Sequence, residues 1–181
     1  GEDVARGGGA HSIGAGVLGT CGGTNGILIP PDGYIAGVRD ICDRNNILMV
    51  ADEVMAGFGR TGRWFAVDHW DVTPDLMTMA KGLTSSYLPL GAVAMRHDVA
   101  EKFDSMMFYG GLTYSSHPVS LAASLATIGV SQEDRLIGTA TRLAPVLPSH
   151  HTPLPPQPPH PGPPPTPSPY QPPAPVSRPR S

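Results

Sequence analysis

The sequence contains little of what marks a secreted or membrane-spanning protein. Its 181 residues include only two cysteines, Cys21 and Cys42, which are too few for a disulfide framework and whose spacing fits no zinc-binding pattern. No stretch approaches the roughly eighteen consecutive apolar residues that a membrane span requires. Residues 1–6 lack the basic and apolar regions of a signal peptide.

Charge of either sign is also sparse. Lysine and arginine total 12 against 15 aspartates and glutamates, which gives a net charge of -3, and no basic cluster is present that could neutralise a phosphate backbone. We therefore expect no nucleic-acid partner, no membrane partner and a cytoplasmic location. His69, His97 and His117 have no ligand spacing, so we expect no metal site.

Proline is plentiful, but it is unevenly placed. Of the 22 prolines, 17 lie between Pro145 and Pro179, in a segment without aspartate or glutamate and with no apolar run longer than two residues. Proline at this density excludes helix interiors and central strands. We expect residues 144–181 to form an extended, disordered tail with polyproline II character.

The first part of the chain specifies little structure. Residues 1–22 are rich in glycine and alanine and show no helix or strand period, so we expect order to begin near Gly23. The turn residues Pro30–Gly33 then precede a predicted helix over 31–45. The apolar face of this helix is predicted to hold Tyr34, Val38, Ile41 and Cys42.

Three short apolar runs follow, each typical of a strand that is buried on both faces. They span residues 47–51, 76–80 and 91–95, and further helices are predicted over 98–103 and 118–130. Helices that alternate with buried strands indicate an α/β domain with a mainly parallel sheet.

Polar residues stand directly after two of these runs. Asp52 and Glu53 follow the first run, and Lys81 follows the second. Ligands of open parallel sheets bind beyond the carboxyl ends of the strands, so these positions are candidate site residues. A surface ion pair is the simpler explanation for a carboxylate and an amine at strand ends, and on these residues alone we favour it.

The segment Gly57–Gly62 reads Gly-Phe-Gly-Arg-Thr-Gly and matches the spacing of a dinucleotide-binding loop. That fingerprint needs its last glycine to open a long helix whose amino-terminal end faces a pyrophosphate. Here Asp68, Asp71 and Pro74 follow within twelve residues of Gly62. Two carboxylates also precede the loop. We reject dinucleotide binding and interpret the segment as a flexible loop beside a strand end.

Four blocks of the sequence, taken together, resemble the class III aminotransferases, a family of enzymes that use pyridoxal 5'-phosphate (PLP). They are GTNGILIPPDGY (23–34), ADEVMAGFGRTGRW (51–64), PDLMTMAKGL (74–83) and GLTYSSHP (111–118). Their order and spacing also match the family, over about two thirds of the chain. The resemblance implies that residues 23–143 form part of the large α/β domain of a type I PLP-dependent transferase.

The resemblance implies roles for five residues. Asp52 is similar to the aspartate that keeps the pyridine nitrogen of PLP protonated, and Val54 to a branched side chain that packs on the ring. Lys81 resembles the catalytic lysine, which binds the cofactor through its amine and moves a proton. Thr113 is similar to a threonine that binds the cofactor phosphate across a dimer interface. Trp64 corresponds to an aromatic residue near the substrate entrance. From the sequence alone, a tryptophan that simply packs in the hydrophobic core explains this position equally well.

These roles imply a homodimeric transaminase that moves an amino group from an omega-amino acid or amine to pyruvate or another 2-oxo acid. A complete family member is more than twice as long, with a phosphate-binding glycine-serine loop upstream and a substrate-binding arginine downstream. We therefore expect this chain alone to be an inactive fragment. The alternative is a non-catalytic truncated product whose Pro-rich tail is an interaction arm or inert.

Both ends of the chain are expected to be reading-frame artefacts. The family has a Glu-Pro pair shortly before the first block, where this chain has Leu18-Gly19-Thr20. If these residues are encoded as CTT-GGA-ACC, a shift of one base reads Leu-Glu-Pro. The tail over 144–181, rich in proline, histidine and serine, is what a GC-rich gene read out of frame would produce.

Overall fold

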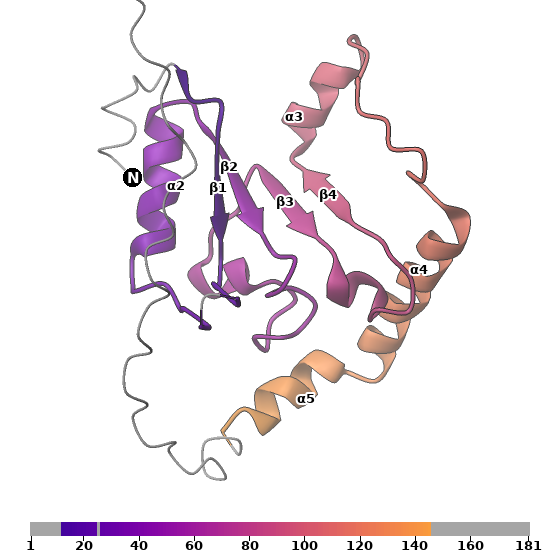
Figure 1. Cartoon of the computed structure of the whole chain (residues 1–181). Coiled ribbons are helices and arrows are strands. Elements are labelled where there is room, and N and C mark those ends of the chain that lie inside the picture. Colours follow the sequence, from indigo (N-terminus) through magenta and orange to yellow (C-terminus); the bar gives the residue numbers. More distant parts are fainter. Residues whose placement is uncertain (1–11, 25, 146–181) are drawn as a thin grey trace, which may run out of the picture.

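A computed structural model describes residues 12–24 and 26–145. The predictions for residues 1–11 and 146–181 therefore lie outside the described residues. Figure 1 shows the elements in chain order. They are β1 (Ala15–Gly19), α2 (Tyr34–Arg44), β2 (Leu48–Asp52), the 3-10 helix η2 (Ala66–Trp70), β3 (Leu76–Met79), the 3-10 helix η3 (Lys81–Thr84), β4 (Ala92–Met95), α3 (His97–Ala100), the 3-10 helix η4 (Glu101–Phe103), α4 (Pro118–Glu133) and α5 (Leu136–Leu143).

The four strands form one sheet in the order β1-β2-β3-β4 (Figure 1). β1, β2 and β3 are parallel, whereas β4 runs antiparallel to β3. Gly19 lies opposite Asp52, and Asp52 lies opposite Thr78, so the carboxyl ends of the three parallel strands share one edge of the sheet. The predicted α/β domain with a mainly parallel sheet is confirmed.

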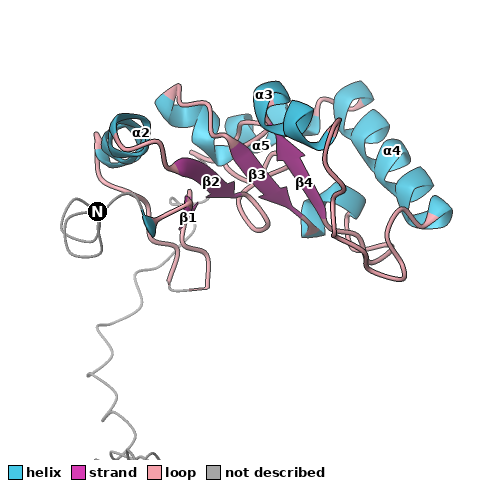
Figure 2. Cartoon of the chain, turned by 90° about the horizontal axis from the view of Figure 1, so that it is seen from above, coloured by secondary structure: helices cyan, strands magenta, loops and turns pink. Residues whose placement is uncertain are grey.

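The core lies between the sheet and α2. Its fully buried members include Ile35 of α2 and Met49 of β2, each of which contributes about 1.5–3 kcal/mol by leaving water. Figure 2 shows α2 and α3 on the same side of the sheet, with α4 flanking it beyond β4. In Figure 1, α5 passes below the carboxyl ends of the parallel strands. Across 12–24 and 26–145, no helix is long and apolar enough to cross a membrane.

The predicted strands agree with β2, β3 and β4 to within one residue at each end. The predicted helices correspond to α2, to α3 followed by η4, and to α4. The prediction of the apolar face of α2 was partly wrong. Cys42 is buried as predicted, but Tyr34 is 50% exposed and Ile35, which was not predicted to be on this face, is buried. The helix begins at Tyr34 after Gly33, whose φ is 78°.

The prediction that order begins near Gly23 was wrong. Residues 15–19 form β1, which pairs with β2 along its whole length. Glycine has a low strand propensity, and three glycines lie between Gly14 and Gly19, so the local signal is weak. The parallel pairing with β2 and the contact of Leu18 with the core outweigh this local preference.

Asp75 joins four elements at the opposite edge of the sheet. Its Oδ2 accepts a hydrogen bond from the Met49 backbone N–H at 2.7 Å and pairs with Arg39 Nη1 of α2 at 2.8 Å. Its Oδ1 pairs with Arg96 Nη1 after β4 at 2.6 Å. Burial would raise the pKa of Asp75, but the Met49 hydrogen bond and the two arginines outweigh burial and lower it.

Candidate functional site

The carboxyl edge of the sheet brings Asp52 and Lys81 to the ends of neighbouring parallel strands. Asp52 is the last residue of β2 and lies opposite Thr78 of β3. The backbone N–H of Glu53 then donates to the Thr78 carbonyl at 3.0 Å, which extends the pairing beyond β2. Lys81 lies two residues after the end of β3 and begins η3. The structure therefore places both residues where the sequence predicted a site.

Asp52 presents a carboxylate that is only partly used by the protein. Its Oδ1 accepts a hydrogen bond from the Val54 backbone N–H at 3.0 Å, which fixes the orientation of the side chain. Its Oδ2 accepts no hydrogen bond from any residue that the structure describes, and the side chain is half-buried. A fixed anion with one open oxygen can bind a cationic N–H group by a strong, charge-assisted hydrogen bond.

Lys81 has an unusual backbone conformation. Its φ is 43°, in the left-handed region that residues other than glycine seldom adopt. Such conformations cost about 1–3 kcal/mol and tend to occur at functional sites. The Lys81 side chain is exposed, and its amine forms no ion pair with a carboxylate of the described residues. Lys81 is therefore a strained residue with an unpaired amine.

Gly82 follows Lys81 where the chain passes close to the loop after β2. A Cβ atom at Gly82 would lie 2.8 Å from the Cβ atom of Phe58. Phe58 itself has a φ of 58° and belongs to the glycine-rich loop. Only glycine allows this approach, which holds Lys81 beside the loop that follows Asp52.

Glu53 is a residue whose role the sequence did not predict. Its side chain is fully buried, and its two oxygens accept the backbone N–H groups of Ala66 at 3.0 Å and Val67 at 2.8 Å. The Glu53 carbonyl also accepts the Gly57 N–H at 3.0 Å. Glu53 thus fixes both ends of the loop between β2 and η2. Its position next to Asp52 was visible in the sequence, but its buried partners were not.

A cavity of about 460 Å³, with both polar and apolar walls, is lined by Lys81. Its walls come from the glycine-rich loop, from η3 and the serines after it, and from α4 and α5. Arg60, Ser85 and Ser86 line it with Lys81. Asp52 does not line this cavity. Asp52 and Lys81 are therefore neighbours along the edge of the sheet, but only Lys81 faces this cavity.

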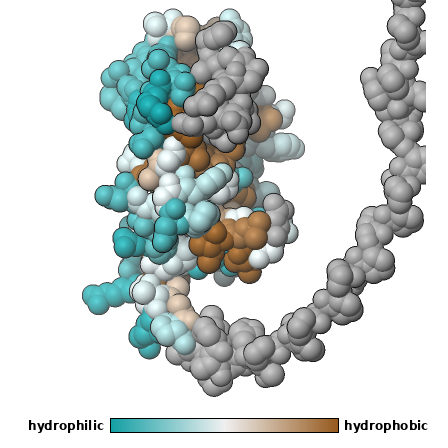
Figure 3. Space-filling model, turned by 90° about the vertical axis from the view of Figure 1, so that its left-hand side faces the viewer, coloured by the Kyte–Doolittle hydropathy of each residue, from teal (hydrophilic) through white to brown (hydrophobic). Residues whose placement is uncertain are grey.

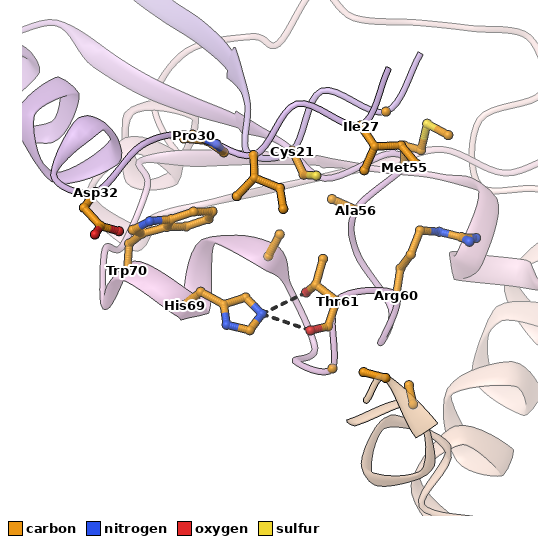
Figure 4. Close-up of a pocket in the computed structure, with 16 residues that line it drawn as sticks. Cys21, Ile27, Pro30, Asp32, Met55, Ala56, Arg60, Thr61, His69 and Trp70 are labelled. Carbon is orange, nitrogen blue, oxygen red and sulfur yellow. Dashed lines mark hydrogen bonds between the residues drawn. The ribbon is translucent and has the colours of Figure 1, made fainter. Parts of the chain in front are cut away.

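A larger cavity, of about 830 Å³, lies on the other side of the glycine-rich loop and is mainly apolar. Figure 4 shows Trp70, Cys21 and Ile27 along it, with the His69 ring bonded to Thr61. His69 Nε2 lies 3.1 Å from both the carbonyl oxygen and Oγ1 of Thr61. Neither Asp52 nor Lys81 lines this cavity, although it is the larger of the two. A site chosen by cavity volume alone would therefore miss Asp52 and Lys81.

Apolar side chains also gather on the outer surface, as one face shows in Figure 3. In the loop after β1, Ile27 is 70% exposed and Ile29 is 73% exposed, and both reach the larger cavity. The side chains of this loop are available for packing by a further segment or subunit.

Two other predicted site residues lie apart from Asp52 and Lys81. Thr113 is exposed in a turn closed by the hydrogen bond from Ser115 N–H to the Leu112 carbonyl, 3.0 Å long. Trp64 is half-buried, its carbonyl accepts the Phe58 N–H at 2.7 Å, and it lines neither cavity. No interaction within the described chain connects either residue to Lys81. In residues 12–24 and 26–145, no group of three potential metal ligands is present.

Comparison with known proteins identifies what this chain is similar to. A family model described as aminotransferase class III matches residues 7–160. The omega-aminotransferase of Caulobacter vibrioides is 44% identical over 142 residues, which are 74% of this chain and 32% of that protein. The putrescine–pyruvate aminotransferase of Pseudomonas aeruginosa is 45% identical over 116 residues, 64% of this chain and 25% of that protein.

Solved structures give the same result. The taurine:2-oxoglutarate aminotransferase from Bifidobacterium kashiwanohense, in complex with PLP and glutamate, superposes with a TM-score of 0.80 and 38% identity, over 82% of this chain and 33% of that one. A transaminase from the marine bacterium Virgibacillus has a TM-score of 0.78 and 38% identity, over 80% of this chain and 33% of that one. The chain thus spans a third or less of the length of these relatives.

Proposed function

Because the chain belongs to the class III aminotransferases, a PLP-dependent family, we propose that it carries part of the PLP site of a transaminase. The reaction moves an amino group from an omega-amino acid or amine to pyruvate or another 2-oxo acid. The names of the relatives, an omega-aminotransferase and a putrescine–pyruvate aminotransferase, support this substrate class. A homodimer, which rests on the resemblance to the family, and a cytoplasmic location belong to the same proposal.

The groups at the carboxyl edge of the sheet fit PLP chemically. The cofactor has a ring nitrogen that can carry a proton and an aldehyde that reacts with amines. Asp52 offers a carboxylate oxygen with no partner in the described chain, and Lys81 offers an unpaired amine at the end of the next strand. When bound, PLP supplies an electron sink for the negative charge that develops on the substrate carbon.

We assign the individual roles as follows. The Asp52 carboxylate binds the protonated ring nitrogen, and Val54, whose N–H orients Asp52, packs against the ring. Lys81 attaches the cofactor, and its Nζ holds and moves a proton, which requires a primary amine on a flexible stem. Thr113 binds the phosphate of the cofactor in a partner subunit, and Trp64 lies near the substrate entrance.

One observation carries the proposal: Asp52 at the end of β2 and Lys81 just after β3 lie at the same edge of the sheet, and Asp52 Oδ2 and the Lys81 amine have no partner among the described residues. The test uses the fact that the chain has two lysines, Lys81 and Lys102. Both are exposed, so their intrinsic access to a reagent is matched. The chain is mixed with PLP, reduced with borohydride and mapped by peptide mass spectrometry.

We expect the label predominantly on Lys81, and an absorbance band of a protonated imine that is lost in Lys81→Ala. Lys102→Ala is the control and should keep both the band and the label. Equal labelling of the two lysines would contradict a built cofactor site. It would favour the alternative, in which the product is non-catalytic and the Pro-rich tail is an interaction arm or inert.

A further inference from the structure

The peptide unit between Glu53 and Val54 forms hydrogen bonds at both of its ends. Its N–H, which belongs to Val54, donates to Asp52 Oδ1 at 3.0 Å. Its carbonyl, which belongs to Glu53, accepts the Gly57 N–H at 3.0 Å. The N–H and C=O of a trans peptide unit lie in one plane and point in opposite directions, so a bond at one end fixes the direction of the other. The orientation of the Asp52 carboxylate is therefore tied to the position of Gly57.

Gly57 is buried, and its close approach to Glu53 requires the absence of a side chain. A Cβ atom at Gly57 would lie 2.8 Å from the Glu53 carbonyl oxygen and 3.2 Å from Cδ1 of Phe65. That oxygen is the acceptor of the Gly57 N–H, so it cannot move away without lengthening the hydrogen bond. Gly59 and Gly62 of the same loop have φ values of 88° and 85°, whereas Gly57 has no left-handed φ. Contact with Glu53, rather than backbone conformation, therefore requires glycine at this position.

Glu53 is held from three sides. Its N–H donates to the Thr78 carbonyl at 3.0 Å, and its own carbonyl accepts the Gly57 N–H. Its fully buried side chain accepts the N–H groups of Ala66 at 3.0 Å and Val67 at 2.8 Å, and both of these residues are themselves buried. Since β3, the loop and η2 all bind Glu53, the peptide unit that follows it has little freedom to rotate.

We infer that Glu53 and Gly57 are positioning residues for Asp52. They hold the Val54 N–H on Asp52 Oδ1, so that Oδ2 stays the oxygen that is free to bind a cationic N–H group. Neither residue needs to touch that group. If they only closed the loop, their loss would lower stability without a specific effect on the Val54 N–H. The identity of the bound group, the protonated ring nitrogen of PLP, rests on the proposed function, whereas the orientation of Asp52 does not.

The first test measures amide hydrogen exchange by NMR in the complete 181-residue chain without cofactor. Asp52→Ala removes the acceptor of the Val54 N–H and gives the exchange rate of that amide without its hydrogen bond. Gly57→Ala should raise the Val54 rate about tenfold or more, toward the Asp52→Ala value, as expected when a hydrogen bond to a charged group is lost. Gly62→Ala is the matched control in the same loop, because its Cβ would also lie 2.8 Å from a neighbour, Thr141 Oγ1. It should leave the Val54 rate near that of the wild type.

Glu53→Gln is the second variant, and it serves if Gly57→Ala does not fold. It should raise the Val54 exchange rate by a smaller factor, because the backbone carbonyl of residue 53 still accepts the Gly57 N–H. A wild-type Val54 rate in Gly57→Ala, or in Glu53→Gln where Gly57→Ala does not fold, overturns the inference. An equal rise in Gly62→Ala also overturns it, since the effect would then follow from general destabilisation.

The second test measures PLP affinity by absorbance titration as a double-mutant cycle. Gly57→Ala should weaken PLP binding about tenfold in the wild-type background. It should have little further effect in Asp52→Ala, because Gly57 acts through Asp52. Equal losses in the two backgrounds would overturn the positioning role. Failed or unselective borohydride labelling of Lys81 overturns the proposed function instead, and the exchange measurement, made without cofactor, still decides whether Asp52 is positioned by Glu53 and Gly57.

Discussion

Asp75→Asn should destabilise the chain strongly while keeping the shape of the side chain. Asp75 is 3% exposed in its side chain and binds Met49, Arg39 and Arg96. An asparagine turns one of its oxygens into an N–H donor that faces other donors. Arg39, whose Nε is already buried without a partner in the described chain, then loses its buried counter-charge. Removing one partner of a buried ion pair costs about 3–5 kcal/mol.

The assay is urea unfolding of the full chain, followed by far-UV circular dichroism. A loss of about 3–5 kcal/mol is a large part of the 5–15 kcal/mol that is typical of a domain. Asp98→Asn is the matched control, because Asp98 also pairs with Arg96 but its side chain is 58% exposed. Exposed pairs contribute little to stability, so this variant should change the midpoint much less. A loss in Asp75→Asn no larger than that in Asp98→Asn would refute the reasoning.

The same network predicts a dependence of stability on pH. The folded pKa of Asp75 is lowered, so the unfolded chain binds a proton first as the pH falls. The stabilisation is complete above the ordinary pKa of about 3.9 and is lost as the pH falls through the lower folded value. Asp75→Asn should therefore lose less stability on acidification than the wild type. Asp98, whose hydrogen bond with Arg96 lowers its pKa to about 2, is present in both proteins and does not distinguish them.

Three further substitutions test the site geometry by the same unfolding assay. Glu53→Gln should lower the free energy of unfolding by about 1–3 kcal/mol, because its amide NH₂ would face a backbone N–H at the start of η2. A change below the error of measurement would contradict the role of the buried Glu53 carboxylate. Lys81→Asn should be neutral or stabilising by up to about 1 kcal/mol, since asparagine tolerates a left-handed φ, and a clear loss would argue against strain at this position. Gly82→Ala should cost about 1–3 kcal/mol because its Cβ meets Phe58, and wild-type stability would disprove the close approach.

The sequence by itself predicted the elements whose signals are local. The apolar runs at 47–51, 76–80 and 91–95 are short and bounded by turn or polar residues, so they indicate buried strands without any knowledge of their partners. Asp52 and Lys81 were identifiable because they follow these runs directly. The rule that parallel strands place ligands at their carboxyl ends then brings the two residues to one edge. β1, in contrast, has too many glycines for a local signal and exists because β2 pairs with it.

Only the tertiary structure decided which polar residues serve the fold and which face the site. Asp52 and Glu53 are neighbours in the chain, but side chains alternate along a strand, so one keeps an open oxygen while the other is buried on backbone N–H groups of η2. Arg60, Ser85 and Lys81 share a cavity only because α4 and α5 pack against the loops that carry them. Such contacts join residues far apart in sequence, and no periodicity or spacing along the chain encodes them.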